Sequence, residues 1–181
     1  MADYTATLAA ASRASERFSD LLEAHRRIVF KVANTYCWDP EDRADLSQEI
    51  VAQLWRAFSA YDPRRPFSTW MYRIALNVAI SSVRRRGREA RTVPFDEAAH
   101  DTADHRRPDP EADERIRALY QVIDRLDPLN RALLLLYLDE HSYREMAEIL
   151  GISETNVGTK LNRLKARIRE DIGGTTPCGS T

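Results

Sequence analysis

The sequence predicts an all-α protein, and three observations support this. Only six of its 181 residues are glycine, whereas alanine, leucine, arginine and glutamate, which all favour helices, are frequent. Apolar residues recur three and four residues apart, and no stretch shows the alternation of a half-buried strand. Two such stretches are separated by an acidic segment that contains prolines. We therefore predict two small helical domains joined by an acidic flexible linker.

The charge and proline pattern divides the chain into five segments. Residues 1–17 are rich in alanine, serine and threonine without a sustained period, and we expect a disordered N-terminal arm there. Residues 18–91 and 115–172 carry the helical periodicity and are the two predicted domains. Between them, 92–114 contain three prolines and eight acidic residues against two arginines, which predicts a linker that does not collapse. Residues 173–181 are expected to form a disordered tail.

The first predicted domain contains three helices separated by turns with prolines. The first helix ends at Asp39, because a residue that precedes proline disfavours the helical conformation. A second helix is predicted over about 41–59, with apolar residues four apart that form a core face. The two prolines in 61–66 form a turn, and a third helix is predicted over about 68–86.

The third helix combines a buried face with a concentration of positive charge. Residues 62–91 contain eight arginines and two acidic residues, a net charge of +6. On a helical wheel, Met71 and its apolar neighbours form one side, and arginines with Asn77 and Ser81 form the other. Arginine binds phosphate through its planar fork of donors, and Trp70 on the polar side can stack on an unpaired base. The alternative is a solvated helix on which Trp70 packs against a neighbour.

Four helices are predicted in the second domain, and the last two form a helix-turn-helix. A helix over about 116–126 and an almost wholly apolar helix over about 129–140 build the core. Two helices over about 143–150 and 154–170 follow, and Gly151 between them permits the left-handed turn that ends a helix. Such a short turn between two helices, the second polar and basic on its outer side, is typical of DNA-reading proteins.

The helix-turn-helix carries further local signals. Ser142 and Glu145 match a capping box. Residues near the start of the last helix would enter the major groove, whereas Arg163 and Lys165 would hold phosphates. Gly158 costs about 1 kcal/mol relative to alanine inside a helix, which close approach to a DNA backbone would explain. The alternative is a helical hairpin that merely packs.

Residues expected of catalytic or metal sites are few and scattered. The two cysteines, Cys37 and Cys178, are far apart, and the four histidines show no catalytic or metal-ligand spacing. We therefore predict no enzyme activity, no metal site, no cofactor and no small-molecule substrate. No apolar stretch nears the ~20 residues of a membrane span, and no secretory signal is visible. We expect a cytoplasmic protein without a membrane partner.

Two stretches of the sequence resemble one known family. "ADLSQEIVAQLWRAFSAYDPRRPFSTWMYRIALNVAISSVRRR" is similar to the region-2 domain of bacterial sigma factors of the extracytoplasmic-function (ECF) group. "LDPLNRALLLLYLDEHSYREMAEILGISETNVGTKLNRLKARIRE" is similar to their region-4 helix-turn-helix domain. The resemblance covers about residues 18–90 and 113–171, and the two motifs occur in the order of the family.

The resemblance implies a sigma factor that binds core RNA polymerase and directs promoter-specific transcription initiation. Its partners would be the clamp coiled coil and the flap of the polymerase, promoter DNA and, as for many relatives, an anti-sigma factor. Region 2 would recognise and open the −10 element, and region 4 would read the −35 element. Housekeeping sigma factors have adjacent tryptophans where this chain has Arg73 and Ile74, which implies weaker melting of promoter DNA.

The resemblance also implies roles for individual residues. The core polymerase-binding residues would be Asp45, Gln48, Glu49 and Trp55. The −10 DNA-binding residues would be Phe67, Trp70, Arg73, Asn77, Ser81, Arg84, Arg85 and Arg88. The −35 DNA-binding residues would be Thr155, Asn156, Thr159, Lys160, Asn162, Arg163 and Lys165. The alternative function is a stand-alone helix-turn-helix regulator whose first domain binds a ligand or dimerises.

Overall fold

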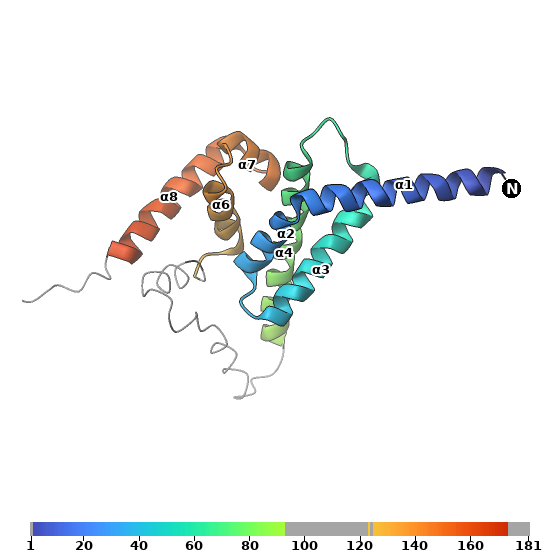
Figure 1. Ribbon diagram of the computed structural model, residues 1–181. Helices are drawn as coiled ribbons and strands as arrows, with labels where there is room; N and C mark the ends of the chain where they lie inside the picture. Colours follow the sequence, from blue (N-terminus) through green and yellow to red (C-terminus); the bar gives the residue numbers. More distant parts are fainter. Residues whose placement is uncertain (1, 93–122, 124, 174–181) are drawn as a thin grey trace, which may run out of the picture.

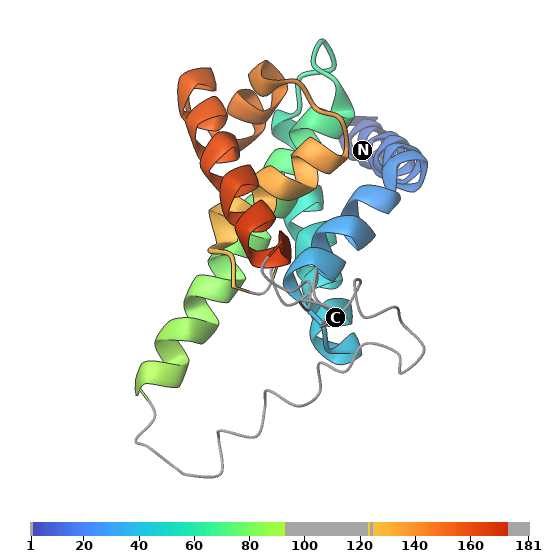
Figure 2. The ribbon, with the colours of Figure 1, turned by 90° about the vertical axis from the view of Figure 1, so that its left-hand side faces the viewer.

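The computed structural model describes residues 2–92, 123 and 125–173, and it confirms the all-α fold (Figure 1). Within these residues the elements are α1 (Ala2–His25), α2 (Arg27–Tyr36), α3 (Pro40–Ala57), the 3-10 helix η1 (Phe58–Ala60), α4 (Phe67–Thr92), α6 (Pro128–Leu138), α7 (Tyr143–Leu150) and α8 (Glu154–Gly173). Helices α1 to α4 form an N-terminal bundle, and α6 to α8 form a C-terminal bundle (Figures 1 and 2). The predicted linker after Thr92, most of the predicted helix over 116–126 and the tail from residue 174 lie outside the described residues.

Helix α1 begins at Ala2, where the sequence predicts a disordered arm over 1–17. Alanine has the strongest helix propensity, and no glycine or proline interrupts this stretch. Ser12 Oγ donates to Glu16 Oε1 at 3.2 Å, one turn later, and Phe18 is buried in the core. The structure therefore corrects the arm to a helix whose C-terminal part is anchored in the bundle.

The N-terminal bundle packs α2, α3 and α4 around one apolar core. Asp39 caps α3 by accepting hydrogen bonds from the backbone N–H of Glu41 at 2.8 Å and of Asp42 at 3.1 Å. This cap, followed directly by Pro40, confirms the predicted break between the first two helices. The predicted core faces of α3 and α4 are both buried. Their buried residues include Leu46, Ile50, Leu54, Met71, Ala75 and Ala79.

The C-terminal bundle contains the predicted helix-turn-helix. Ser142 and Glu145 make both hydrogen bonds of the capping box, and Gly151 has a φ of 67° at the end of α7. Ser153 Oγ accepts from the backbone N–H of Asn156 at 3.2 Å, in the first turn of α8. The core of this bundle is contributed by all three helices. Its buried residues include Leu133, Leu136, Met146, Ile149, Val157 and Leu161.

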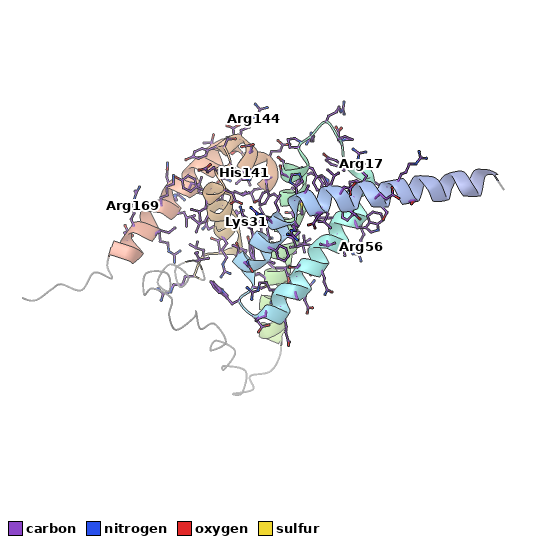
Figure 3. All side chains as sticks on the ribbon, viewed as in Figure 1. Arg17, Lys31, Arg56, His141, Arg144 and Arg169 are labelled. Carbon is purple, nitrogen blue, oxygen red and sulfur yellow. The ribbon has the colours of Figure 1, made fainter. Side chains whose placement is uncertain are left out.

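The two bundles contact each other directly. Helix α7 packs against α4, and α6 packs against α2 and α4 (Figures 1 and 2). Figure 3 shows Lys31 of α2 and His141, which precedes α7, in this region of the molecule. The polar faces of α4 and α8 therefore belong to two bundles that are held together.

Candidate nucleic-acid and polymerase interfaces

One side of α4 presents a row of exposed polar and cationic side chains. The exposed residues of this row are Arg73, Asn77, Ser81, Arg84 and Arg88. They recur at three- and four-residue spacing, while the opposite side of α4 is packed in the core. Ser81, Arg84 and Arg88 line, together with Gly87, an open depression of about 570 Å³. The structure thus brings these five predicted −10 residues onto one surface.

The arginines at positions 85 and 86 point elsewhere. Arg85 donates to Glu49 Oε2 at 3.4 Å, and Arg86 donates to Asp42 Oδ2 at 2.6 Å, so both side chains reach α3. Arg86 also donates to Sγ of the buried Cys37 at 3.1 Å. Arg85, a predicted −10 residue, is therefore engaged within the bundle. Its partner Glu49, a predicted polymerase-binding residue, faces the same way.

The two aromatic residues of the predicted −10 set lie in an aromatic cluster. Between ring centroids, Trp70 is 5.1 Å from Tyr61, 5.2 Å from Phe67 and 6.4 Å from Phe58. Trp70 is half-buried, and Phe67 is only 5% exposed, so Phe67 supports Trp70 and offers little surface of its own. Trp70 therefore packs on neighbours and still exposes part of its ring. Sequence reasoning missed Tyr61, because a tyrosine in a turn with prolines carries no local sign of packing.

The outer face of α8 carries most of the predicted −35 residues. Those with exposed side chains are Thr155, Asn156, Thr159, Asn162 and Arg163. Thr159 Oγ1 donates to the carbonyl oxygen of Thr155 at 2.9 Å, so the hydroxyl oxygen remains available as an acceptor. Lys160 is half-buried, and Lys165 Nζ lies 3.9 Å from the ring centroid of Tyr137 on α6. The exposed part of the face consists mainly of short neutral side chains.

Gly158 lies where α8 passes the ring of Tyr143. A Cβ atom at position 158 would lie 3.5 Å from Tyr143 Cε2, an ordinary van der Waals distance. The packing of the chain on itself therefore does not require glycine here. Close approach to a DNA backbone stays a prediction for this position.

An apolar groove lies between α1, α2 and α3. It has a volume of about 710 Å³ and exposes two large rings, Phe30 at 57% and Trp55 at 46%. Trp55 and Gln48, two predicted polymerase-binding residues, line this groove, and Asp45 is exposed on the same helix. Phe18 of α1 packs edge-on against Trp55, with 5.1 Å between ring centroids. Sequence reasoning missed Phe30, because its neighbours in an apolar stretch made it resemble a core residue.

Shifted pKa values occur away from the exposed faces of α4 and α8. Burial raises the pKa of Tyr36, and burial together with a hydrogen bond to Asp139 raises the pKa of Tyr72. The Ser142 hydroxyl and backbone N–H lower the pKa of Glu145. Among the described residues, no three metal-ligating side chains gather in one place. None of the helices in that part of the chain combines the length and hydrophobicity needed to cross a membrane.

Comparison with known proteins agrees with the order of the two bundles. The family model of sigma-70 region 2 matches residues 21–89, and the model of sigma-70, region 4 matches residues 116–168. The ECF RNA polymerase sigma factor SigE of Mycolicibacterium smegmatis is 30% identical over 159 residues, which are 84% of this chain and 60% of that protein. The ECF RNA polymerase sigma factor SigW of Bacillus subtilis is 25% identical, over 87% of this chain and 89% of the relative.

Two solved structures have a similar fold. The sigma factor RpoE in complex with the anti-sigma factor NepR from Bartonella quintana has a TM-score of 0.62 at 17% identity, over 90% of this chain and 98% of that chain. CnrH in complex with the cytosolic domain of CnrY has a TM-score of 0.61 at 23% identity, over 92% of this chain and 96% of that chain. The two family models together cover most of the sequence. The chain therefore belongs to the sigma-70 family of RNA polymerase sigma factors, in its extracytoplasmic-function group.

Proposed function

We propose how this sigma factor, which directs promoter-specific transcription initiation by RNA polymerase, divides the task among its surfaces. Residues 18–91 bind core polymerase and the −10 element, residues 115–172 bind the −35 element, and 92–114 connect them. The observation that carries the proposal is the two-sided α4, which is packed in the core on one side and lined by cations on the other. These are binding tasks, so the chain itself catalyses no covalent step.

The exposed row on α4 binds the separated DNA strand at the −10 element. Arg73 and Arg84 bind phosphates, and Asn77 between them hydrogen-bonds to bases. Trp70, near the start of the row, stacks the exposed part of its ring on an unpaired base. Phe67 holds that ring from the buried side. This combination suits a strand whose bases are already unstacked.

The first turns of α8 read the −35 element in the major groove. Thr155 and Asn156 follow the cap at Ser153 and are exposed, which is the part of a recognition helix that contacts base edges. Arg163 lies two turns further along and binds the phosphate backbone. Lys165 adds a phosphate contact only after it leaves the ring of Tyr137.

The groove between α1, α2 and α3 binds core polymerase. Large exposed rings such as Phe30 and Trp55 are typical anchors of protein interfaces. The exposed carboxylate of Asp45 and the amide of Gln48 add polar contacts for a partner with basic and polar side chains. We assign this groove to the clamp coiled coil of the polymerase, and the C-terminal bundle to its flap.

An anti-sigma factor is a second partner that we infer. RpoE was solved with the anti-sigma factor NepR, and CnrH with the cytosolic domain of CnrY. An inhibitor that covers Phe30 and Trp55 would compete with polymerase for the groove. Since the polymerase works in the cytoplasm, we infer that this chain acts there. Co-purification from cells would show polymerase subunits with the chain, and a separate complex with any inhibitor.

Transcription with purified core polymerase tests the proposed function. Adding the chain is expected to give promoter-dependent transcripts that core polymerase alone does not make. The alternative, a stand-alone regulator, predicts tight binding to duplex DNA without polymerase, which a gel-shift titration measures. Tight binding by the isolated chain, with no promoter-dependent transcript from any genomic fragment, would favour the alternative.

A further inference from the structure

Asp139 joins the two bundles. Its carboxylate, directly after α6, accepts hydrogen bonds from Lys31 Nζ of α2 and from the Tyr72 hydroxyl of α4. The Asp139 side chain is 16% exposed, and Tyr72 is 4% exposed with the ring of His141 edge-on at 5.1 Å. A carboxylate with so little solvent access needs such donors, because an unpaired buried charge is costly. We call Asp139, Lys31 and Tyr72 the latch.

Two further polar contacts cross between the bundles. The Tyr36 hydroxyl of α2 donates to the carbonyl oxygen of Pro128 at 2.5 Å, at the opposite end of α6 from the latch. Arg65, just before α4, donates to Glu148 of α7 at 3.2 Å. Polar contacts of this kind are typical of interfaces between domains that move relative to one another, whereas permanent interfaces are more apolar.

The closed arrangement leaves both DNA-facing rows exposed but holds them close together. The −35 and −10 elements are centred about 25 base pairs apart by their names, or ~85 Å along B-form DNA. A compact chain of this length has a diameter of only about 40 Å. The segment 93–122 between the bundles is long enough to span ~100 Å when extended. The closed chain can therefore bind one element at a time, and the chain length permits separation.

We propose that the latch keeps the free sigma factor closed, and that it breaks before one chain contacts both promoter elements. Closure itself follows from the contacts between the bundles. Its consequence for DNA binding rests on the proposed assignment of the −10 and −35 surfaces. Core polymerase and a two-element promoter bind the open form better, and they shift the population toward it.

The variant Lys31→Met/Tyr72→Phe tests the latch, because it removes both donors and keeps most of the bulk of both side chains. Nitroxide labels at Arg56→Cys and Arg169→Cys report the distance between the bundles, since both positions are exposed and lie on opposite bundles (Figure 3). Losing one hydrogen bond to a charged group shifts an equilibrium by about tenfold or more. By double electron–electron resonance, we expect one short distance for the unmodified latch and an additional longer, broader population for the variant.

The controls separate opening from unfolding and from labelling artefacts. Cys178→Ser removes one native thiol, and Cys37 is buried, so a chain without the introduced cysteines should take up no label. Tyr143→Phe removes the hydroxyl of an exposed tyrosine on α7 and should leave the distance unchanged. Circular dichroism should show the same helix content for all variants. Identical distance distributions for the latch variant and its parent, whether both short or both long, would overturn the proposal.

DNA binding gives a second readout. The latch variant should bind a fragment with both elements, its −10 segment unpaired, several-fold more tightly than the parent does. Both should bind a −35 fragment equally, because the outer face of α8 is exposed in the closed form. A changed distance distribution without any binding to either fragment would refute the proposed function and leave the latch standing. Equal affinities on both fragments despite a changed distance would refute the role of the latch in DNA binding.

Discussion

The polar rows of α4 and α8 differ in chemistry although both belong to DNA-facing helices. The α4 row is dominated by arginines and ends at a tryptophan that is held in an aromatic cluster. The exposed α8 row consists mainly of threonine and asparagine, and Lys165 is turned toward Tyr137. Charge and stacking suit phosphates and unpaired bases, whereas short polar side chains suit base edges in an intact groove. The two helices are therefore expected to fail in different ways when they are altered.

The largest effect is expected from Arg73→Ala/Arg84→Ala. Each lost charge-assisted contact costs about 1.5–3 kcal/mol, so promoter-dependent transcription should fall by roughly 100-fold or more. The salt dependence of holoenzyme binding should weaken by about 0.7 per phosphate contact on a single strand. Arg56→Ala, an exposed arginine on α3 outside the proposed DNA surfaces, serves as the control. An unchanged salt slope in the double variant would mean that this row does not bind phosphates.

Trp70→Ala is expected to weaken binding of a single-stranded −10 oligonucleotide by the holoenzyme. Stacking on one base contributes about 1–3 kcal/mol, and the affinity should fall accordingly. Because Trp70 also packs on Tyr61 and Phe67, the melting temperature of the isolated chain should fall as well. Trp70→Phe keeps an aromatic ring and should recover part of the affinity. A lower melting temperature with unchanged affinity for the oligonucleotide would reduce Trp70 to a packing role.

Thr155→Ala/Asn156→Ala should lower affinity only for DNA that carries the preferred −35 sequence. Good base contacts contribute about 1–3 kcal/mol of discrimination, so the preference over an altered −35 sequence should shrink. Competition between the two sequences for the holoenzyme measures this ratio. The salt slope should stay the same, in contrast to the α4 variant. Equal losses on both sequences would instead assign these residues to backbone contacts.

Local features of the fold could be predicted from the sequence, and tertiary ones could not. The cap at Asp39, the capping box at Ser142 and the turn at Gly151 depend on neighbours within a few residues, and the structure shows each of them. The helical start of the chain was missed, because an alanine-rich segment without a large apolar stripe is also compatible with an unfolded arm.

Within the candidate sites, the helical wheel predicted which side of α4 is exposed but not which arginines find partners. Arg85 pairs with a residue 36 positions away, and the latch joins Lys31 to a residue 108 positions away. No sequence period reports contacts of this kind, because they depend on how helices pack. The same reason explains why Phe30 and Tyr61 were not selected.

Ser142→Ala should destabilise the C-terminal bundle by about 1 kcal/mol, the usual cost of losing an N-cap. The effect should depend on pH, because hydrogen bonds from Ser142 lower the pKa of Glu145 in the folded chain. A lowered pKa stabilises the fold above the unfolded value of about 4.3, and this contribution is lost as the pH falls through the folded value. Thermal melts of the variant and its parent should differ at pH 7 and converge below about pH 4. A constant difference across this range would exclude the link to Glu145.

The smallest effect, Gly158→Ala, sharpens the comparison of the two helices most directly. Alanine favours a helix over glycine by about 1 kcal/mol, and its Cβ would meet Tyr143 at an ordinary 3.5 Å. The melting temperature should therefore rise slightly. If the backbone of α8 approaches DNA closely at this position, binding to the −35 fragment should weaken at the same time, whereas binding to the single-stranded −10 oligonucleotide should not change. A more stable variant with unchanged −35 affinity would show that Gly158 does not serve a close approach to DNA, and the α8 surface would then be defined by its exposed side chains alone.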